Sequence, residues 1–112
     1  MSRQKPSTGT RRGAKSTRGR GDIAVLPLTL MRLYFEQILA GKKKTEFRED
    51  KAYWRARLVG RSFAEVHFRN GYAADAPLMR VECLGVTLPS RRDPRFRIRL
   101  GRILARKNCR GL

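Results

Sequence analysis

The segment 41–48, Gly-Lys-Lys-Lys-Thr-Glu-Phe-Arg, places a carboxylate among several cations at close spacing. In an extended strand alternate side chains point the same way, so Lys44, Glu46 and Arg48 would share one face. A turn before the strand can also bring Lys43 beside Glu46. An acid between two cations suits the binding of a polyanion, with one acceptor directed at a base or a reacting atom. The alternation is equally typical of a solvated edge strand whose charges prevent pairing with another chain.

The chain is strongly basic: its 112 residues include 27 Lys and Arg but 9 Asp and Glu, a formal net charge of +18. Seven of the basic residues and none of the acidic residues lie in 1–21, so residues 22–112 keep 20 basic and 9 acidic residues, a net +11. A folded part this basic favours a polyanion as partner, with RNA the leading choice. The length has room for one small domain.

Residues 1–21 are rich in Arg, Gly, Ser and Thr and poor in apolar residues, so we expect a disordered basic tail. The domain is expected to cover 22–106, followed by a basic C-terminal tail at 107–112. The apolar run at 23–31 is far shorter than the roughly 20 residues of a membrane-spanning helix and lacks a signal-peptide cleavage pattern. We therefore expect a cytoplasmic protein that does not contact a membrane.

The apolar periodicity predicts an α+β domain of five strands and two short helices. Strands are expected at 23–28, 45–48, 63–68, 78–88 and 95–100, and helices at 30–40 and 51–58. The fourth strand should be bulged at Gly85, and residues 101–112 should fray.

Particular residues are expected to begin and anchor the two helices. Thr29 is the expected N-cap of the first helix. Its buried stripe should consist of Leu30, Leu33, Tyr34 and Ile38, and the apolar anchors of the second helix should be Tyr53, Trp54 and Leu58.

The last strand has the cleanest alternation, with Phe96, Ile98 and Leu100 on one face and Arg95, Arg97 and Arg99 on the other. Arginines about 7 Å apart on one strand face match the roughly 6 to 7 Å between phosphates of an extended single strand. The alternative is an outer sheet face of solvated arginines.

Further candidates lie in the turn 69–72, Arg-Asn-Gly-Tyr. We include Arg69 and Tyr72 among the nucleic-acid-binding residues, although Tyr72 can either stack on a base or only close the hairpin. The lone His67 and the cysteines Cys83 and Cys109 lack metal-ligand spacing, so we expect neither a metal nor a cofactor.

Taken together, the order of elements and the Gly-x-Lys-x-x-Glu-x-Arg pattern resemble the ASCH domain family over residues 23–104. Its signature falls on Gly41, Lys43, Glu46 and Arg48. The resemblance implies a PUA-like fold, a small mixed β-barrel of about five strands with two short flanking helices, whose cleft is thought to receive RNA.

Some members of that family are amidohydrolases that remove an acetyl group from modified cytidine. They use the motif lysine, a threonine at the position of Glu46, and a glutamate on an insert before the last strand. Here the lysine is kept as Lys43, but the threonine is absent and the insert is reduced to the turn 88–94. We do not carry that activity over.

Three functions remain open. The first is an RNA-binding domain that holds a nucleotide in a basic cleft. The second is an enzyme acting on RNA or on a small-molecule modified nucleoside, with Lys43 and Glu46 as catalytic candidates and Glu82 as a possible second acid. The third is a ribosome-associated basic protein in which charge matters and the cleft does not. The sequence gives no indication of the oligomeric state.

Overall fold

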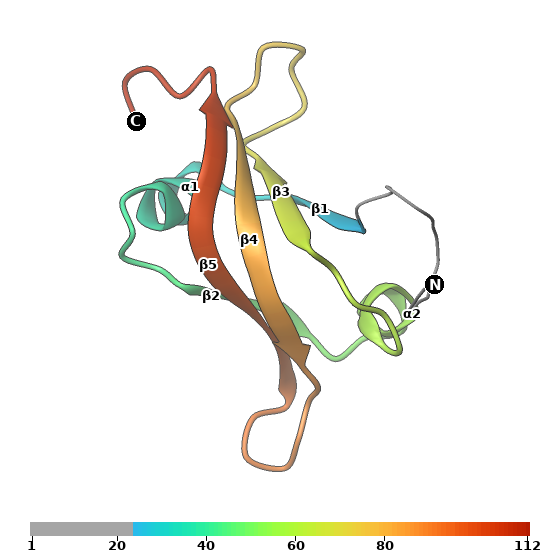
Figure 1. Ribbon diagram of the computed structural model, residues 1–112. Coiled ribbons are helices and arrows are strands. Elements are labelled where there is room, and N and C mark those ends of the chain that lie inside the picture. Colours follow the sequence, from blue (N-terminus) through green and yellow to red (C-terminus); the bar gives the residue numbers. More distant parts are fainter. Residues whose placement is uncertain (1–23) are drawn as a thin grey trace, which may run out of the picture.

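The structure is a computed structural model that describes residues 24–112, with one five-stranded sheet and two helices (Figure 1). The strands are β1 (Val25–Thr29), β2 (Thr45–Glu49), β3 (Glu65–Arg69), β4 (Leu78–Thr87) and β5 (Arg95–Lys107). The helices are α1 (Arg32–Leu39) and α2 (Ala52–Leu58). The predicted α+β class, with five strands and two short helices, is confirmed. The predicted tail 1–21 lies outside the described residues.

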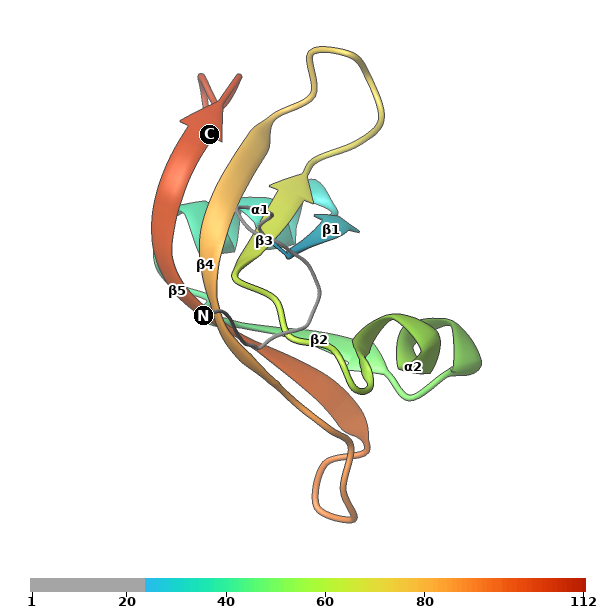
Figure 2. The same cartoon turned by 45° about the vertical axis from the view of Figure 1, so that its right-hand side comes forward.

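The sheet is mixed and curls into a half-barrel (Figure 2). Its strand order is β1-β3-β4-β5-β2, with β1 and β3 parallel and the other neighbouring pairs antiparallel. The strands β1 and β2 therefore form the two edges of the sheet. Each leaves one row of backbone groups outside the ladder, which makes the edges the natural place for a ligand or another chain to contact the sheet.

One face of the sheet carries the hydrophobic core. Alternate residues of the central strands are buried, among them Val66, Phe68, Phe96, Ile98 and Leu100. The alternation predicted for the last strand is confirmed, because its arginines lie on the opposite, exposed face. Both helices contribute to the same core, so they lie over this face of the sheet.

The first helix begins later than predicted. The chain stays extended beyond Thr29 because the amide of Leu30 donates a hydrogen bond to the carbonyl oxygen of Arg69, which prolongs the contact between β1 and β3 (2.8 Å). Met31, and not Thr29, occupies the N-cap position, and it makes no capping hydrogen bond with its side chain. The predicted N-cap is therefore wrong.

This shift changes the face that α1 buries. Phe35 and Ile38 enter the core, whereas Leu33 and Tyr34 are 59% and 42% exposed. The prediction of burial was correct for Leu30 and Ile38 and wrong for Leu33 and Tyr34. Because Tyr34 points away from the core, its ring is available to the pocket described below.

The second helix has only two of its three predicted anchors. Leu58 is buried and Trp54 packs against the core, one turn apart on one side of α2. Tyr53 lies on another side and is 56% exposed, so its prediction as an anchor is wrong. Neither helix in the described part of the chain is long and apolar enough to cross a membrane.

The last strand is longer than predicted. β5 continues to Lys107, which pairs with Leu78 of β4, so the prediction that residues 101–112 fray is wrong for 101–107. Beyond the strand, Cys109 and Leu112 pack against the core. The predicted bulge at Gly85 is confirmed by the register shift next to it and by its φ of 142°, which L-residues rarely adopt.

Candidate functional site

The turn between α1 and β2 determines where Lys43 lies. Gly41 takes a left-handed conformation with φ 78°, and the amides of Lys42 and Lys43 both donate to the carbonyl oxygen of Gln37 (2.9 and 3.1 Å). These bonds satisfy an otherwise unpaired carbonyl at the end of the helix and fold the chain back on it. The Lys43 side chain consequently reaches Glu46, as the sequence predicted.

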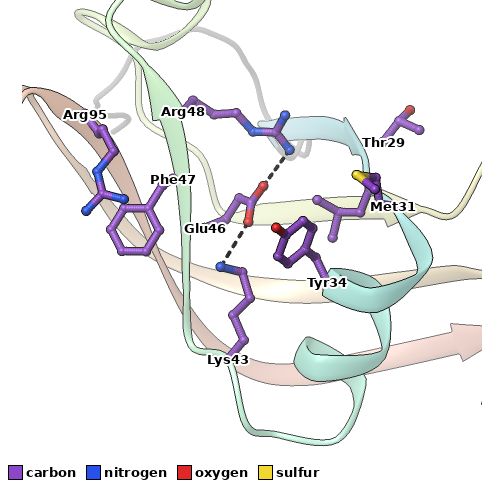
Figure 3. A pocket seen from close by; sticks show the side chains of 9 residues that line it. Thr29, Met31, Tyr34, Lys43, Glu46, Phe47, Arg48 and Arg95 are labelled. Carbon is purple, nitrogen blue, oxygen red and sulfur yellow. Dashed lines mark ion pairs between the residues drawn. The ribbon is translucent and has the colours of Figure 1, made fainter.

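Glu46 is a buried carboxylate held between two cations. Its Oε1 lies 3.5 Å from the Nζ of Lys43 and its Oε2 lies 2.7 Å from the Nη2 of Arg48, while the whole residue is 7% exposed (Figure 3). A buried charge is tolerated when it is paired, and here one carboxylate pairs with both cations. Lys44, which was also expected on this face, precedes the strand and is exposed.

The alternation of β2 decides which of its side chains enter the site. Glu46 and Arg48 lie opposite Ile98 and Phe96 of β5, on the face that carries the core. Phe47 points to the other side of the strand. The edge strand therefore presents charged groups on one face and an aromatic ring on the other.

Aromatic rings hold the cations of the site in place. The Nζ of Lys43 lies 5.5 Å from the centroid of the Tyr34 ring and 5.2 Å from that of Phe47. Arg95 approaches the Phe47 ring to 4.0 Å, and Arg48 approaches the Trp54 ring to 4.9 Å. Cation–π contacts of this kind restrict long side chains that would otherwise sample many rotamers.

All of these groups except Trp54 line a pocket of about 490 Å³. Its wall is formed by the end of β1, the start of α1, the edge strand β2 and the first residue of β5, with the lining residues Thr29, Leu30, Met31, Tyr34, Lys43, Glu46, Phe47, Arg48 and Arg95. Figure 3 shows Lys43 and Arg48 reaching Glu46 from opposite sides, with Phe47 and Arg95 on the far side of β2. The pocket therefore extends around an edge strand.

Arg48 has hydrogen-bonding capacity that the protein does not use. Its Nε and Nη2 atoms are buried and make no hydrogen bond with the residues that the structure describes. The Nη2 atom faces the Glu46 carboxylate as an ion pair, which leaves Nε without any such partner. Buried donors without acceptors are rare in folded proteins and often mark a place where a water or a ligand binds.

The three arginines predicted on one face of the last strand, Arg95, Arg97 and Arg99, have different partners. Arg95 forms two hydrogen bonds with Asp93 through Nε and Nη2 (2.9 and 3.2 Å), and these bonds lower the pKa of Asp93. The Nε of Arg97 lies 3.9 Å from the same carboxylate, and Arg99 lies beside Gly85. Of the three arginines, Arg95 lines the pocket and the other two extend the basic face beyond it.

Two other predicted residues do not line the pocket. Arg69 donates to the carbonyl oxygens of Gly71 and Ala73 (2.7 and 2.9 Å), so it closes the loop after β3. Tyr72 is 84% exposed in that loop. Neither residue is brought next to Lys43 and Glu46.

A second charged cluster, which sequence reasoning missed, lies on β3 and β4. Glu65 is 8% exposed and accepts hydrogen bonds from Arg80 (2.9 and 3.2 Å), while the Nε2 of His67 lies 2.9 Å away from its Oε1. These partners lower the pKa of Glu65 to about 2. Glu82, expected as a second acid, pairs opposite Glu65 and accepts from the amide of Arg102, outside the pocket.

Two aromatic residues of the site were also missed. Tyr34 was placed in the core by helical periodicity, and Phe47 was treated only as a strand residue. The prediction that Trp54 packs in the core is confirmed, but its contact with Arg48 was not predicted. The sequence does contain a signal for these contacts. Aromatic residues lie close to the charged segment 41–48 both before and after it, and aromatic rings can cover cations.

No match appears when the chain is compared with protein-family models, with curated proteins or with solved structures. The functional argument therefore depends on the site itself.

We expect that replacing Glu46 by alanine destabilises the fold, because it removes the partner of two largely buried cations. The expected loss is about 3 kcal/mol, the lower end of the range for breaking a buried pair. Glu49→Ala is the matched control, because Glu49 and Lys51 form an exposed pair on the same part of the chain (3.0 Å), worth less than about 1 kcal/mol. Urea unfolding measures both losses, and equal losses would contradict the account.

The pKa of Glu65 predicts how stability depends on pH. Folding lowers it from 4.5 to about 2, so the folded state favours the ionised carboxylate and its contribution is complete above about pH 4.5. This contribution is lost as the pH falls toward 2. We expect Glu65→Gln to reduce the slope of stability against pH in this window, measured by urea midpoints. Parallel curves for the two proteins would show that Glu65 does not contribute.

Proposed function

We propose that the protein binds single-stranded RNA and holds one nucleotide in the pocket around Lys43, Glu46 and Arg48. The observation that carries the proposal is that three cations, a buried acceptor and exposed aromatic surface converge on one pocket. Its volume falls within the roughly 300 to 1,000 Å³ of small-molecule sites. Each kind of group matches one part of a nucleotide.

The base has a surface to stack on and an acceptor to contact. Tyr34 is partly exposed beside the pocket and, of the cations that the structure describes, only Lys43 lies near its ring, whereas both Lys43 and Arg95 contact the Phe47 ring. Single-stranded bases are recognised by stacking on aromatic rings and by hydrogen bonds to their edges. The Glu46 carboxylate has lone pairs beyond its two ion pairs, so it favours base edges that present N–H donors.

The phosphates have cations on both sides of the pocket. Lys43 and Arg48 lie within it, and Arg97 and Arg99 continue the exposed face of β5 from Arg95. Phosphate contacts supply most of the affinity of such proteins and make it depend on salt. The net +11 on residues 22–112 supports the same polyanionic partner.

We also propose that the chain is a diverged ASCH-like domain of the PUA-like type. The support is the order of strands and helices, the curled mixed sheet, and the meeting of the motif residues Lys43, Glu46 and Arg48 at one pocket.

The arrangement of Lys43 supports a binding role over a catalytic one. Its ammonium group faces the Glu46 carboxylate and lies near two rings, as expected for a held cation. A nucleophilic lysine would need a free amine directed at the substrate. We therefore propose binding and not turnover.

The test compares two lysines of equal charge. Lys43→Met removes a cation of the pocket, whereas Lys51→Met removes an exposed one that pairs with Glu49. We expect the first to weaken binding of a labelled single-stranded RNA about tenfold, or about 1.4 kcal/mol, and the second to have a much smaller effect, measured by fluorescence anisotropy. Binding of the unaltered protein should weaken steeply as salt rises.

Equal effects of the two substitutions would mean that RNA binding depends on the net charge of the protein and not on the pocket. Affinity unchanged between low and moderate salt would exclude phosphate contacts as the main source of binding.

A further inference from the structure

A continuous series of contacts between cations and aromatic rings leaves the pocket and runs onto α2. From the pocket outward, the Arg48 guanidinium lies 4.9 Å from the Trp54 ring, and the Trp54 and Tyr53 rings meet edge to face at 4.8 Å. The guanidinium of Arg57 then lies 3.7 Å from the Tyr53 ring. The Tyr53 ring is thus two short contacts away from a residue that lines the pocket.

Core packing does not account for Tyr53. Leu58 and Trp54 already anchor α2, and more than half of the Tyr53 surface is exposed. Its ring is nevertheless held in a definite position, by Trp54 on one side and by Arg57, which also donates a hydrogen bond to the Tyr53 carbonyl oxygen (3.4 Å). An exposed aromatic ring oriented beside a cation is the kind of surface on which a base stacks.

The direction of the series follows the edge of the sheet. Figures 1 and 2 show that β2 runs from the side of α1 to α2. The pocket-lining residues of β2 and the helix that carries Tyr53 therefore follow one another along this edge of the sheet. An extended strand of nucleic acid can follow such an edge, with successive bases meeting successive rings. The exposed face of β5 offers arginines but no equally exposed ring, so it suits phosphates alone.

From these contacts we propose that Tyr53 and Arg57 form a second nucleotide subsite, and that the ligand is a single-stranded oligonucleotide spanning both subsites. Trp54 lies between the two subsites, in contact with Arg48 of the first and Tyr53 of the second. The proposal rests on the proposed function, because it extends the same site. It adds that a lone nucleotide fills only part of the binding surface.

The experiment compares a mononucleotide with a single-stranded tetraribonucleotide. Binding to the full chain is measured by calorimetry and by quenching of Trp54, the one tryptophan of the sequence. The tetranucleotide should bind more tightly. In Tyr53→Ala the ratio of the two affinities should fall about tenfold, within the range for loss of one base–aromatic stack, and in Tyr53→Phe it should be retained.

Leu88→Ala is the control, because Leu88 is a large apolar residue about as exposed as Tyr53 (51% and 56%) and does not line the pocket. It should leave the ratio unchanged. Unfolding curves confirm that each variant is folded, and Tyr53→Phe keeps the test valid if the alanine variant is unstable.

The outcomes separate the two proposals. If both ligands bind and Tyr53→Ala leaves the ratio unchanged, the second subsite is wrong and the pocket stands. If neither ligand binds, the proposed function fails and the second subsite fails with it.

Discussion

The pairing of one buried carboxylate with two cations is the constraint on which the site depends. Glu46 lies on the core-facing side of an edge strand, where its charge would be costly without Lys43 and Arg48. Both cations are thereby drawn to the rim of a half-barrel, and neighbouring rings restrict them further. The result is a preorganised basic pocket at an open edge, where an incoming ligand meets groups that are already positioned.

Much of the fold follows from local pattern. The alternation of Phe96 and Ile98 with arginines predicts β5, and the glycine that ends α1 predicts the turn before β2. The local sequence pattern does not reveal the effect of pairing between strands that are far apart in the sequence. The bond from Leu30 to Arg69 joins residues far apart in sequence and keeps the chain extended beyond Thr29, and the helix that follows buries Phe35 and not Leu33 or Tyr34.

The charged residues of the candidate site could be predicted from the sequence, but the residues that contact them could not. The alternation of β2 placed Glu46 and Arg48 on one face, and the glycine before the strand allowed a turn that brings Lys43 beside them. The contact between Glu65 and Arg80 was not detectable, because it depends on the register of β3 against β4. Tyr34 was misassigned for a related reason: helical periodicity identifies apolar residues without showing which of them face a pocket and which face the core.

The most direct test of this account is to map binding by nuclear magnetic resonance, titrating the isotope-labelled full chain with a short single-stranded RNA. We predict that the shifted amides cluster at residues 29–34 and 43–48, together with Arg95, and that the side-chain Nε signal of Arg48 shifts as its buried donors gain an acceptor. Shifts spread over exposed basic residues such as Arg106 and Lys107, with the pocket unaffected, would contradict the account.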